Sequence, residues 1–176
     1  MRTIAKAGLA LAVFLLATTS WAWDPDEVKE YDAKAQTAIA EFKEKDPSIE
    51  RFFNEAAGYV VIPTVGKGGF GIGGARGKGL LYENGAPTAV VTLTQLTVGF
   101  QAGGQQYTQV MFFENKEALD NFTNGKFKFS SEASAVILES GASANIAYKD
   151  GVAALIESEK GAMFEASLGT QKFKFE

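Results

Sequence analysis

Three basic side chains stand in a segment that is otherwise dominated by glycine. Residues 66–79 read Gly-Lys-Gly-Gly-Phe-Gly-Ile-Gly-Gly-Ala-Arg-Gly-Lys-Gly, and the charged members are Lys67, Arg76 and Lys78. Backbone amides flanked by glycine can form concave sites for anions, and nearby cations strengthen them. These residues are candidates for contacts with a lipid headgroup. The alternative is that the glycines let two tightly bent strands pack against the helical hairpin while the three cations are merely solvated.

The segment does not have the pattern of a nucleotide-binding loop. A P-loop lysine is followed by serine or threonine, whereas Lys78 is followed by Gly79. A dinucleotide-binding turn opens a helix. Here residues 80–85, Leu-Leu-Tyr-Glu-Asn-Gly, indicate a short strand that enters a hairpin turn. We therefore expect no nucleotide ligand.

The composition excludes most forms of catalysis. The chain has no cysteine and no histidine, which removes thiol nucleophiles, Ser-His-Asp triads and ordinary zinc sites. Carboxylate, lysine or tyrosine chemistry remains possible, but no pair of acidic residues stands out by its spacing. We expect a protein that is not an enzyme and needs no cofactor or metal. A carboxylate-based hydrolase is the alternative.

The first 22 residues have the pattern of a secretory signal. Arg2 and Lys6 form a charged start, residues 8–17 form an apolar core, and Ser20-Trp21-Ala22 offers a cleavage pattern. The apolar core is too short to span a bilayer. We expect an exported protein, in the periplasm or outside the cell, with residues 23–176 as one domain.

The charge of the predicted mature chain argues against nucleic acid as a partner. Removing residues 1–22 takes away two of 17 basic residues and none of 21 acidic ones, which leaves 15 − 21 = −6. A nucleic-acid-binding domain needs a basic stripe on its surface. We therefore expect no nucleic acid.

Helix and strand signals divide the chain at residue 58. Asp24, Pro25 and Glu27 form a helix start signal, apolar residues then recur at helical spacing, and Asp46-Pro47 begins a second helical piece. Later, Asn115 can cap a short helix that runs to about Asn124. Two-residue hairpin turns are expected at 84–85, 150–151 and 160–161. Strands are expected at 58–65, 69–75, 78–83, 88–96, 107–113, 126–138, 141–149, 152–158, 162–168 and 171–176.

These signals together predict an α+β domain. We expect an N-terminal helical hairpin packed on a strongly bent antiparallel sheet or partial β-barrel, with one short additional helix.

The sequence Lys-Phe-Lys-Phe occurs twice, at 126–129 and at 172–175. In a strand, this alternation puts the phenylalanines on one face and the lysines on the other. One interpretation is that the phenylalanines enter the core while the lysines protect exposed or edge strands. The other is a lysine face that meets anionic headgroups. Its candidate residues are Lys126, Lys128, Lys172 and Lys174.

Four stretches of the chain resemble the SYLF-domain family. Residues 56–74, Ala-Ala-Gly-Tyr-Val-Val-Ile-Pro-Thr-Val-Gly-Lys-Gly-Gly-Phe-Gly-Ile-Gly-Gly, resemble its glycine-rich signature. Residues 94–99, 109–113 and 160–168 resemble its central, next and closing strands. The resemblance implies lipid binding rather than catalysis, because eukaryotic SYLF proteins bind phosphoinositides with the help of a basic amphipathic N-terminal helix. Some also bind and bundle actin, while bacterial relatives are mostly exported.

The N-terminal helices of this chain depart from that pattern. Residues 24–55 hold ten acidic side chains and five basic ones. A helix aimed at anionic lipid should carry a basic polar face, so we do not expect the helix-based mechanism. We also do not expect actin as a partner in a bacterial envelope. The expected partner is an anionic lipid or membrane surface; the alternative is a protein-interaction or structural module that holds an envelope protein.

Overall fold

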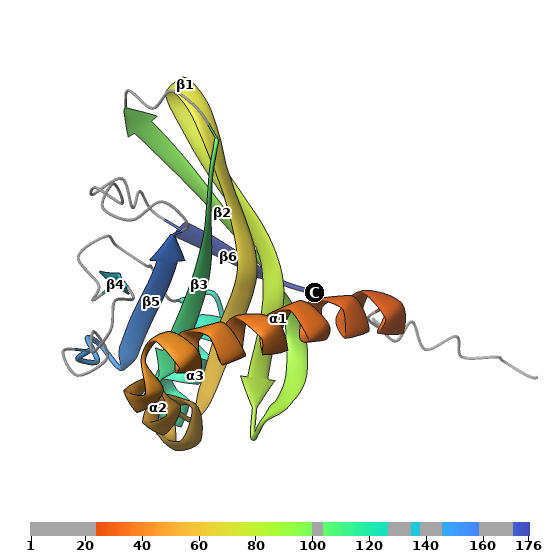
Figure 1. The fold of residues 1–176 in the computed structure, drawn as a ribbon, viewed down its shortest axis with the longest axis vertical. Coiled ribbons are helices and arrows are strands. Elements are labelled where there is room, and N and C mark those ends of the chain that lie inside the picture. The colour runs from red at the N-terminus through yellow and green to blue at the C-terminus, as the bar shows by residue number, and fades with distance from the viewer. Residues whose placement is uncertain (1–23, 100–103, 127–134, 138–145, 159–170) are drawn as a thin grey trace, which may run out of the picture.

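The computed structural model describes residues 24–99, 104–126, 135–137, 146–158 and 171–176. They form an α+β fold in which helices lie on a curved six-stranded sheet that is not closed (Figure 1). The strand order is β4-β5-β3-β1-β2-β6, and every neighbouring pair is antiparallel except β4 and β5. The predicted fold class is confirmed.

The N-terminal helices begin at the predicted caps. Helix α1 spans Pro25–Lys45, and the side chain of Asp24 accepts a hydrogen bond of 3.0 Å from the backbone N–H of Asp26. A 3-10 turn, η1 (Pro47–Ile49), follows, and the carboxylate of Asp46 caps it in the same way. Helix α2 (Glu50–Glu55) completes the helical hairpin. None of the described helices is both long and apolar enough to cross a membrane.

Strand β1 (Gly58–Glu83) replaces three strands that the sequence predicts separately. It rises, bends at the glycine-rich segment and descends beside its own first half (Figure 1). The first arm pairs with β3 (Gln105–Phe113), and the second arm pairs with β2 (Ala86–Gly99). Gly69, in the bend, has a φ of 155°, a value that favours glycine.

Glycine is required where the two arms of β1 meet. A Cβ on Gly77 would lie 2.7 Å from Cγ2 of Ile62 and 2.8 Å from the carbonyl oxygen of Thr64. A Cβ on Gly79 would overlap the carbonyl oxygen of Val61. At these two positions, the glycines are explained by close packing of strands.

Two of the predicted hairpin turns are confirmed by their backbone angles. Asn84 and Gly85, between β1 and β2, have φ values of 53° and 78°. Asp150 and Gly151 precede β5 (Val152–Ser158) and have φ values of 52° and 75°. Positive φ at both central residues is the requirement of a type I′ turn. The turn expected at 160–161 lies outside the described residues.

The remaining elements are one helix and two short strands. Helix α3 (Lys116–Thr123) begins at the predicted cap, Asn115. Strand β4 (Ala135–Ile137) lies within the strand expected at 126–138, and β6 (Gln171–Phe175) is the predicted closing strand. The strand expected at 162–168, and most of the strand expected at 141–149, lie outside the described residues.

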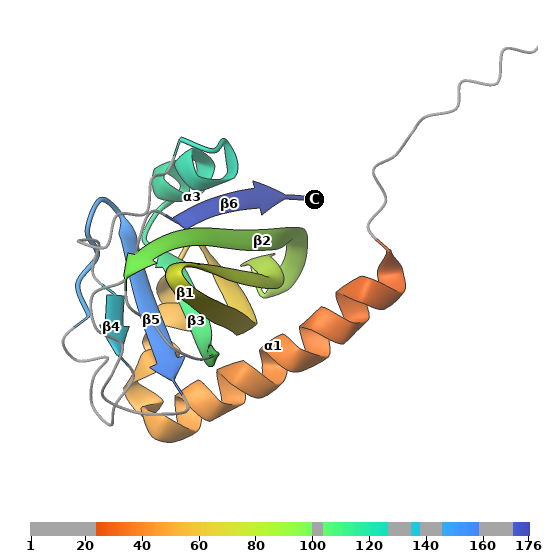
Figure 2. The same cartoon turned by 90° about the horizontal axis from the view of Figure 1, so that it is seen from above.

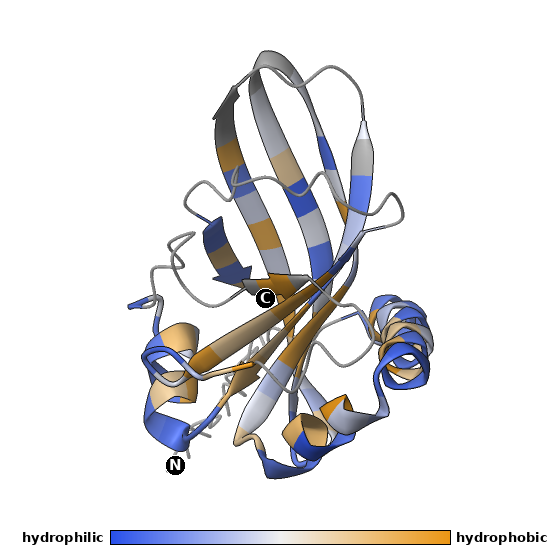
Figure 3. Cartoon of the chain, turned by 60° about the vertical axis from the view of Figure 1, so that its left-hand side comes forward, coloured by the Kyte–Doolittle hydropathy of each residue, from blue (hydrophilic) through white to orange (hydrophobic). Residues whose placement is uncertain are grey.

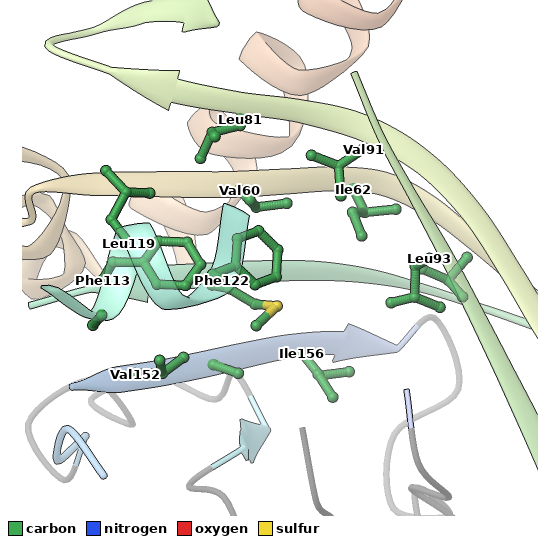
Figure 4. Packing of buried hydrophobic residues seen from close by; sticks show 14 of the residues in the cluster. Val60, Ile62, Leu81, Val91, Leu93, Phe113, Leu119, Phe122, Val152 and Ile156 are labelled. Atoms are coloured by element: carbon green, nitrogen blue, oxygen red, sulfur yellow. The ribbon is translucent and has the colours of Figure 1, made fainter. Parts of the chain in front are cut away.

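The sheet has an apolar cluster on each face. On one face, α3 packs through Leu119 and Phe122 against Phe113 of β3 and residues of β1, β2 and β5 (Figure 4). The ring of Phe122 lies 5.0 Å from that of Phe173 and 5.0 Å from that of Phe175. These phenylalanines are partly buried against the core, as the first interpretation of the repeat at 172–175 predicts.

On the other face, α1 and α2 cover the sheet. Ala35, Ile39 and Phe42 of α1 are buried against Leu80 and other residues of the strands. Hydrophobic residues are concentrated in the part of the sheet beside the helices, whereas the end that carries the bend of β1 is more polar (Figure 3).

Three buried glutamines form a hydrogen-bonded chain across β3, β6 and β2. Nε2 of Gln109 on β3 donates to Oε1 of Gln171 on β6 at 3.1 Å. Nε2 of Gln171 donates to Oε1 of Gln95 on β2 at 3.2 Å. Because β1 and β2 lie between β3 and β6 in the strand order, the bond between Gln109 and Gln171 shows that the sheet is strongly curled.

Candidate functional site

A groove of about 450 Å³ lies between α1 and the two arms of β1. Helix α1 and the second arm contribute its basic side chains, Lys34, Arg76 and Lys78. The other lining residues are Tyr31, Pro63, Thr64, Gly66 and Gly77. The structure therefore brings two of the three predicted cations together and adds a third from the helix.

Arg76 and Lys78 share a face of the sheet because side chains alternate along a strand. Leu80 and Tyr82, further along the same arm, belong to the cluster beneath α1. Counting back by two residues places Lys78 and Arg76 on that same face.

Lys67 lies on the opposite face. Val65, two residues before it, belongs to the cluster beneath α3. The side chain of Lys67 is also buried, with 8% exposed, and burial lowers the pKa of its ammonium group. Lys67 therefore does not join Arg76 and Lys78 in the groove.

Two of the three basic side chains in the groove are paired with carboxylates. Nζ of Lys78 lies 2.8 Å from Oε1 of Glu27 and 3.8 Å from Oε2 of Glu176. Nζ of Lys34 lies 2.6 Å from Oε1 of Glu30, one turn earlier on α1. The hydrogen bond to Glu27 raises the pKa of Lys78, and the hydrogen bond to Glu30 raises that of Lys34. Both lysines therefore remain cationic at neutral pH.

Arg76, like Lys34, is an exposed cation of the groove. Within the described part of the chain, its guanidinium has no ion pair or side-chain hydrogen bond. A guanidinium presents donors in a planar fork that matches phosphate and carboxylate groups. Arg76 can therefore bind an anion without first losing an internal partner.

A hydrogen bond holds α1 in place at this edge of the groove. The hydroxyl of Tyr82 donates to Oδ1 of Asp32 at 2.7 Å, and the ring of Tyr59 stacks on that of Tyr82 with centroids 5.0 Å apart. Burial, followed by the contact with Asp32, raises the pKa of Tyr82 strongly. The tyrosine therefore stays protonated and remains a donor to the helix.

The predicted lysine candidates outside the glycine-rich segment fall in different places. Lys172 and Lys174 are exposed on β6, and Nζ of Lys174 lies 3.4 Å from Oε1 of Glu176. Lys126 is exposed just after α3. Lys128 lies outside the described residues.

Lys34 is the residue of this groove that the sequence analysis missed. The helix that carries it was predicted, and its spacing from Tyr31 places both residues near one side of that helix. The crossing of α1 over β1 is what brings it to Arg76, and no local pattern in the sequence specifies that crossing.

The groove can bind an anion without covalent chemistry. Its polar groups are the two ammonium groups of Lys34 and Lys78, the guanidinium of Arg76, and the hydroxyls of Tyr31 and Thr64. Among the described residues, no group of three or more acidic side chains could hold a metal ion.

Comparisons with known proteins relate part of the chain to a known family. Residues 94–174 match the sequence model of Ysc84, described as "Las17-binding protein actin regulator", the family that contains the SYLF domain. The chain is also 28% identical over 149 residues to "Beta cell expansion factor A" of Aeromonas veronii. Residues 94–174 carry the sequence pattern of the SYLF family.

The matched part of the chain begins in β2 and ends in β6. The match to the Aeromonas protein covers 79% of this chain and 53% of the relative, so the chain spans about half the length of that protein. SYLF domains are binding and regulatory domains, not known as enzymes, and in eukaryotes they are known for actin regulation and lipid binding. The groove residues Lys34, Arg76 and Lys78 lie before residue 94, so the family match does not assign them a role.

Proposed function

We propose that this SYLF protein binds anionic lipid headgroups, without catalysis, through the groove between α1 and β1. The observation that carries the proposal is the exposed guanidinium of Arg76, which stands beside Lys34 and Lys78 without an acidic partner among the described residues. Lipid binding by eukaryotic members of the family supports the choice of ligand class.

The internal ion pairs set the expected strength of this binding. A phosphate that approaches Lys34 or Lys78 competes with Glu30 or Glu27 for the ammonium group. Arg76 meets no such competition within the described chain and can donate two parallel hydrogen bonds to phosphate. We therefore infer reversible binding in which Arg76 contributes most and which salt weakens.

The proposed place of action is the cell envelope. The signal-like pattern of residues 1–22 supports export, with the periplasm as the proposed compartment. This setting would present the groove to anionic phospholipids.

Vesicle flotation of residues 23–176 tests the proposal. Vesicles of phosphatidylcholine alone would be compared with vesicles that contain phosphatidylglycerol, each at low and high salt. The test variant is Lys34→Ala/Arg76→Ala. Lys116→Ala/Lys126→Ala is the charge-matched control because both lysines are exposed near α3. Circular dichroism would establish that all three proteins are folded.

We expect the wild type and the control to float with anionic vesicles at low salt, and the test variant to bind several-fold less. Equal binding by the wild type, the test variant and the control would contradict binding in the groove. If the wild type does not bind any vesicle, lipid binding is wrong, and the alternative of a module that holds an envelope protein takes its place.

A further inference from the structure

We propose that an anionic bilayer docks on the outer face of three adjacent segments of the sheet: the second arm of β1, strand β2 and strand β6. Arg76 and Lys172 would contact headgroups on this docking face, and Leu96 would enter the membrane interface. The inference rests on the proposed lipid binding and adds the surface that meets the membrane, including a second hollow outside the groove at α1.

Two cross-strand rows of side chains define the docking face. In the first row, Arg76 is paired with Thr94, and Thr94 is paired with Lys172. In the second row, Lys78 is paired with Thr92, and Thr92 is paired with Lys174. Directly opposed residues on neighbouring strands project from the same face. Each row therefore carries a cation at both ends, about 10 Å apart at the usual strand spacing.

The first row is exposed, and the second is partly covered. Arg76, Thr94 and Lys172 are all exposed. By contrast, Thr92 is buried, and Lys78 lies beneath Glu27 of α1. Glu176 lies within ion-pair distance of both Lys78 and Lys174. Charge is thus compensated in the second row, whereas the cations of the first row have no ion pair within the described chain.

The first row lies between two hollows. The groove at α1 reaches Arg76 at one end of the row. At the other end, Thr94, Gln95, Leu96 and Lys172 line a second hollow of about 450 Å³. Figure 2 shows β2 and β6 side by side and farther from α1 than β1 is. The exposed row therefore continues the groove across the sheet to its β6 edge.

Leu96 adds an apolar group to this cationic surface. Its exposed fraction is 67%, and among the side chains that the structure describes it is the large hydrophobic one that is exposed to solvent. Leu96 lies two residues after Thr94, so it projects from the same face, and it is paired with Gly74, which has no side chain to cover it.

An apolar side chain beside separated cations fits a bilayer better than a free anion. Membrane-surface binding increases with both buried apolar area and attraction to anionic lipid. A soluble phosphate could neutralise Arg76, but it would not remove Leu96 from water or reach Lys172 at the same time. The formal net charge of the chain is −4, so the chain as a whole is not attracted to an anionic surface. The local cationic row therefore also determines which face of the protein turns toward that surface.

The first part of the test measures partition of residues 23–176 onto vesicles that contain phosphatidylglycerol. Lys172→Ala should lower partition about fivefold at low salt, since one cation near an anionic surface is worth about 1 kcal/mol. Leu96→Ser should lower it at low and at high salt, because the lost contribution is apolar. Lys116→Ala is the charge-matched control and should leave partition unchanged.

Binding of sn-glycerol 3-phosphate, followed by NMR, separates the docking face from the groove at α1. Leu96→Ser and Lys172→Ala should leave the affinity for this soluble headgroup unchanged, whereas Arg76→Ala should weaken both binding processes. If the wild type binds vesicles and the Leu96 and Lys172 variants bind equally well, the docking face is wrong while lipid binding stands. If the wild type binds neither probe, both proposals fail.

A fluorescence measurement places Leu96 directly. The test protein begins at residue 23 and so lacks Trp21, and Trp23→Phe removes the other tryptophan. In this background, Leu96→Trp should show a blue-shifted fluorescence emission on anionic vesicles. Thr123→Trp, at the exposed end of α3, is the matched control and should show no shift. A shift at position 123 without one at 96 would overturn the proposed orientation.

Discussion

Two glycines of the same segment should tolerate substitution very differently. A Cβ on Gly79 would overlap the carbonyl oxygen of Val61, which is backbone and cannot rotate away. A Cβ on Gly68 would meet nothing within 4 Å. We expect Gly79→Ala to lower the free energy of unfolding by about 3 kcal/mol or to prevent folding.

Gly68→Ala should change the same quantity by less than about 0.5 kcal/mol, as is usual for surface substitutions. Chemical denaturation of both variants measures the difference. Equal costs at the two positions would mean that the close approach of the two β1 arms does not exist in solution.

The buried ammonium group of Lys67 makes stability depend on pH. Burial lowers the pKa of Lys67 in the folded chain below the ordinary value of 10.5, which applies to the unfolded chain. At a pH between the folded and the unfolded pKa, the unfolded chain therefore binds more protons than the folded chain. The contribution of Lys67 to stability therefore rises as the pH rises through that window.

Replacing this lysine should remove that dependence. The free energy of unfolding of Lys67→Met minus that of the wild type should decrease between pH 8 and pH 10.5. For Lys116, the hydrogen bond to Asp120 raises the pKa, so Lys116→Met should show no such decrease over this range. Urea denaturation at a series of pH values measures both differences, and a constant gap for Lys67→Met would contradict the lowered pKa.

The different placements of Lys67 and Arg76 show what alternation in the sequence could not predict. Val61 belongs to the cluster beneath α1, and strict alternation from it would place Lys67 on that face with Arg76. The pairing of β1 with β3 shifts register between Ile62 and Val65, and Val65 consequently faces α3. An irregularity of this kind depends on the partner strand, so the sequence of β1 alone did not reveal it.

At the scale of elements, one buried hydroxyl links α1 to the sheet. Tyr82→Phe removes the hydrogen bond to Asp32 while keeping the ring that stacks on Tyr59. Hydrogen bonds to charged groups contribute roughly 1.5–3 kcal/mol, so we expect a loss of stability of that size. Tyr31→Phe, on the same helix, is the matched control.

Thermal and urea unfolding would measure both tyrosine variants. A loss confined to Tyr82→Phe supports the link between helix and strand. Equal, small losses in the two variants would mean that the hydrogen bond from Tyr82 to Asp32 contributes little to holding α1 on the sheet.

Elements with local signals were predictable, and those that depend on distant partners were not. The caps of α1 and α3 and the turns at 84–85 and 150–151 follow from side chains and backbone preferences within a few residues. The union of three expected strands into β1 does not, because it requires the two arms to lie against each other. The groove shares this limit, since Lys34 reaches Arg76 through the packing of a helix on a strand 42 residues further along.

At the scale of the whole molecule, the class of fold was predictable and the strand order was not. A change from helical to alternating spacing at residue 58 predicts α+β, but the placement of β6 beside β2 requires pairing between distant parts of the chain, such as Gln95 with Gln171. The family match at residues 94–174 covers the second part of β2 and most of β6, but it does not include the second arm of β1. The predicted signal at residues 1–22 remains a prediction.

The two ion pairs of Lys78 also join distant parts of the chain. Lys78 holds carboxylates of Glu27 and Glu176, which are separated by roughly 150 residues, so the described chain closes into a noncovalent ring. The entropy lost on closing a loop grows only with the logarithm of its length, and doubling the loop costs about 0.6 kcal/mol. Lengthening a surface turn within the ring by a few residues should therefore hardly weaken this junction, and the separation between the two carboxylates along the chain can change without opening the ring.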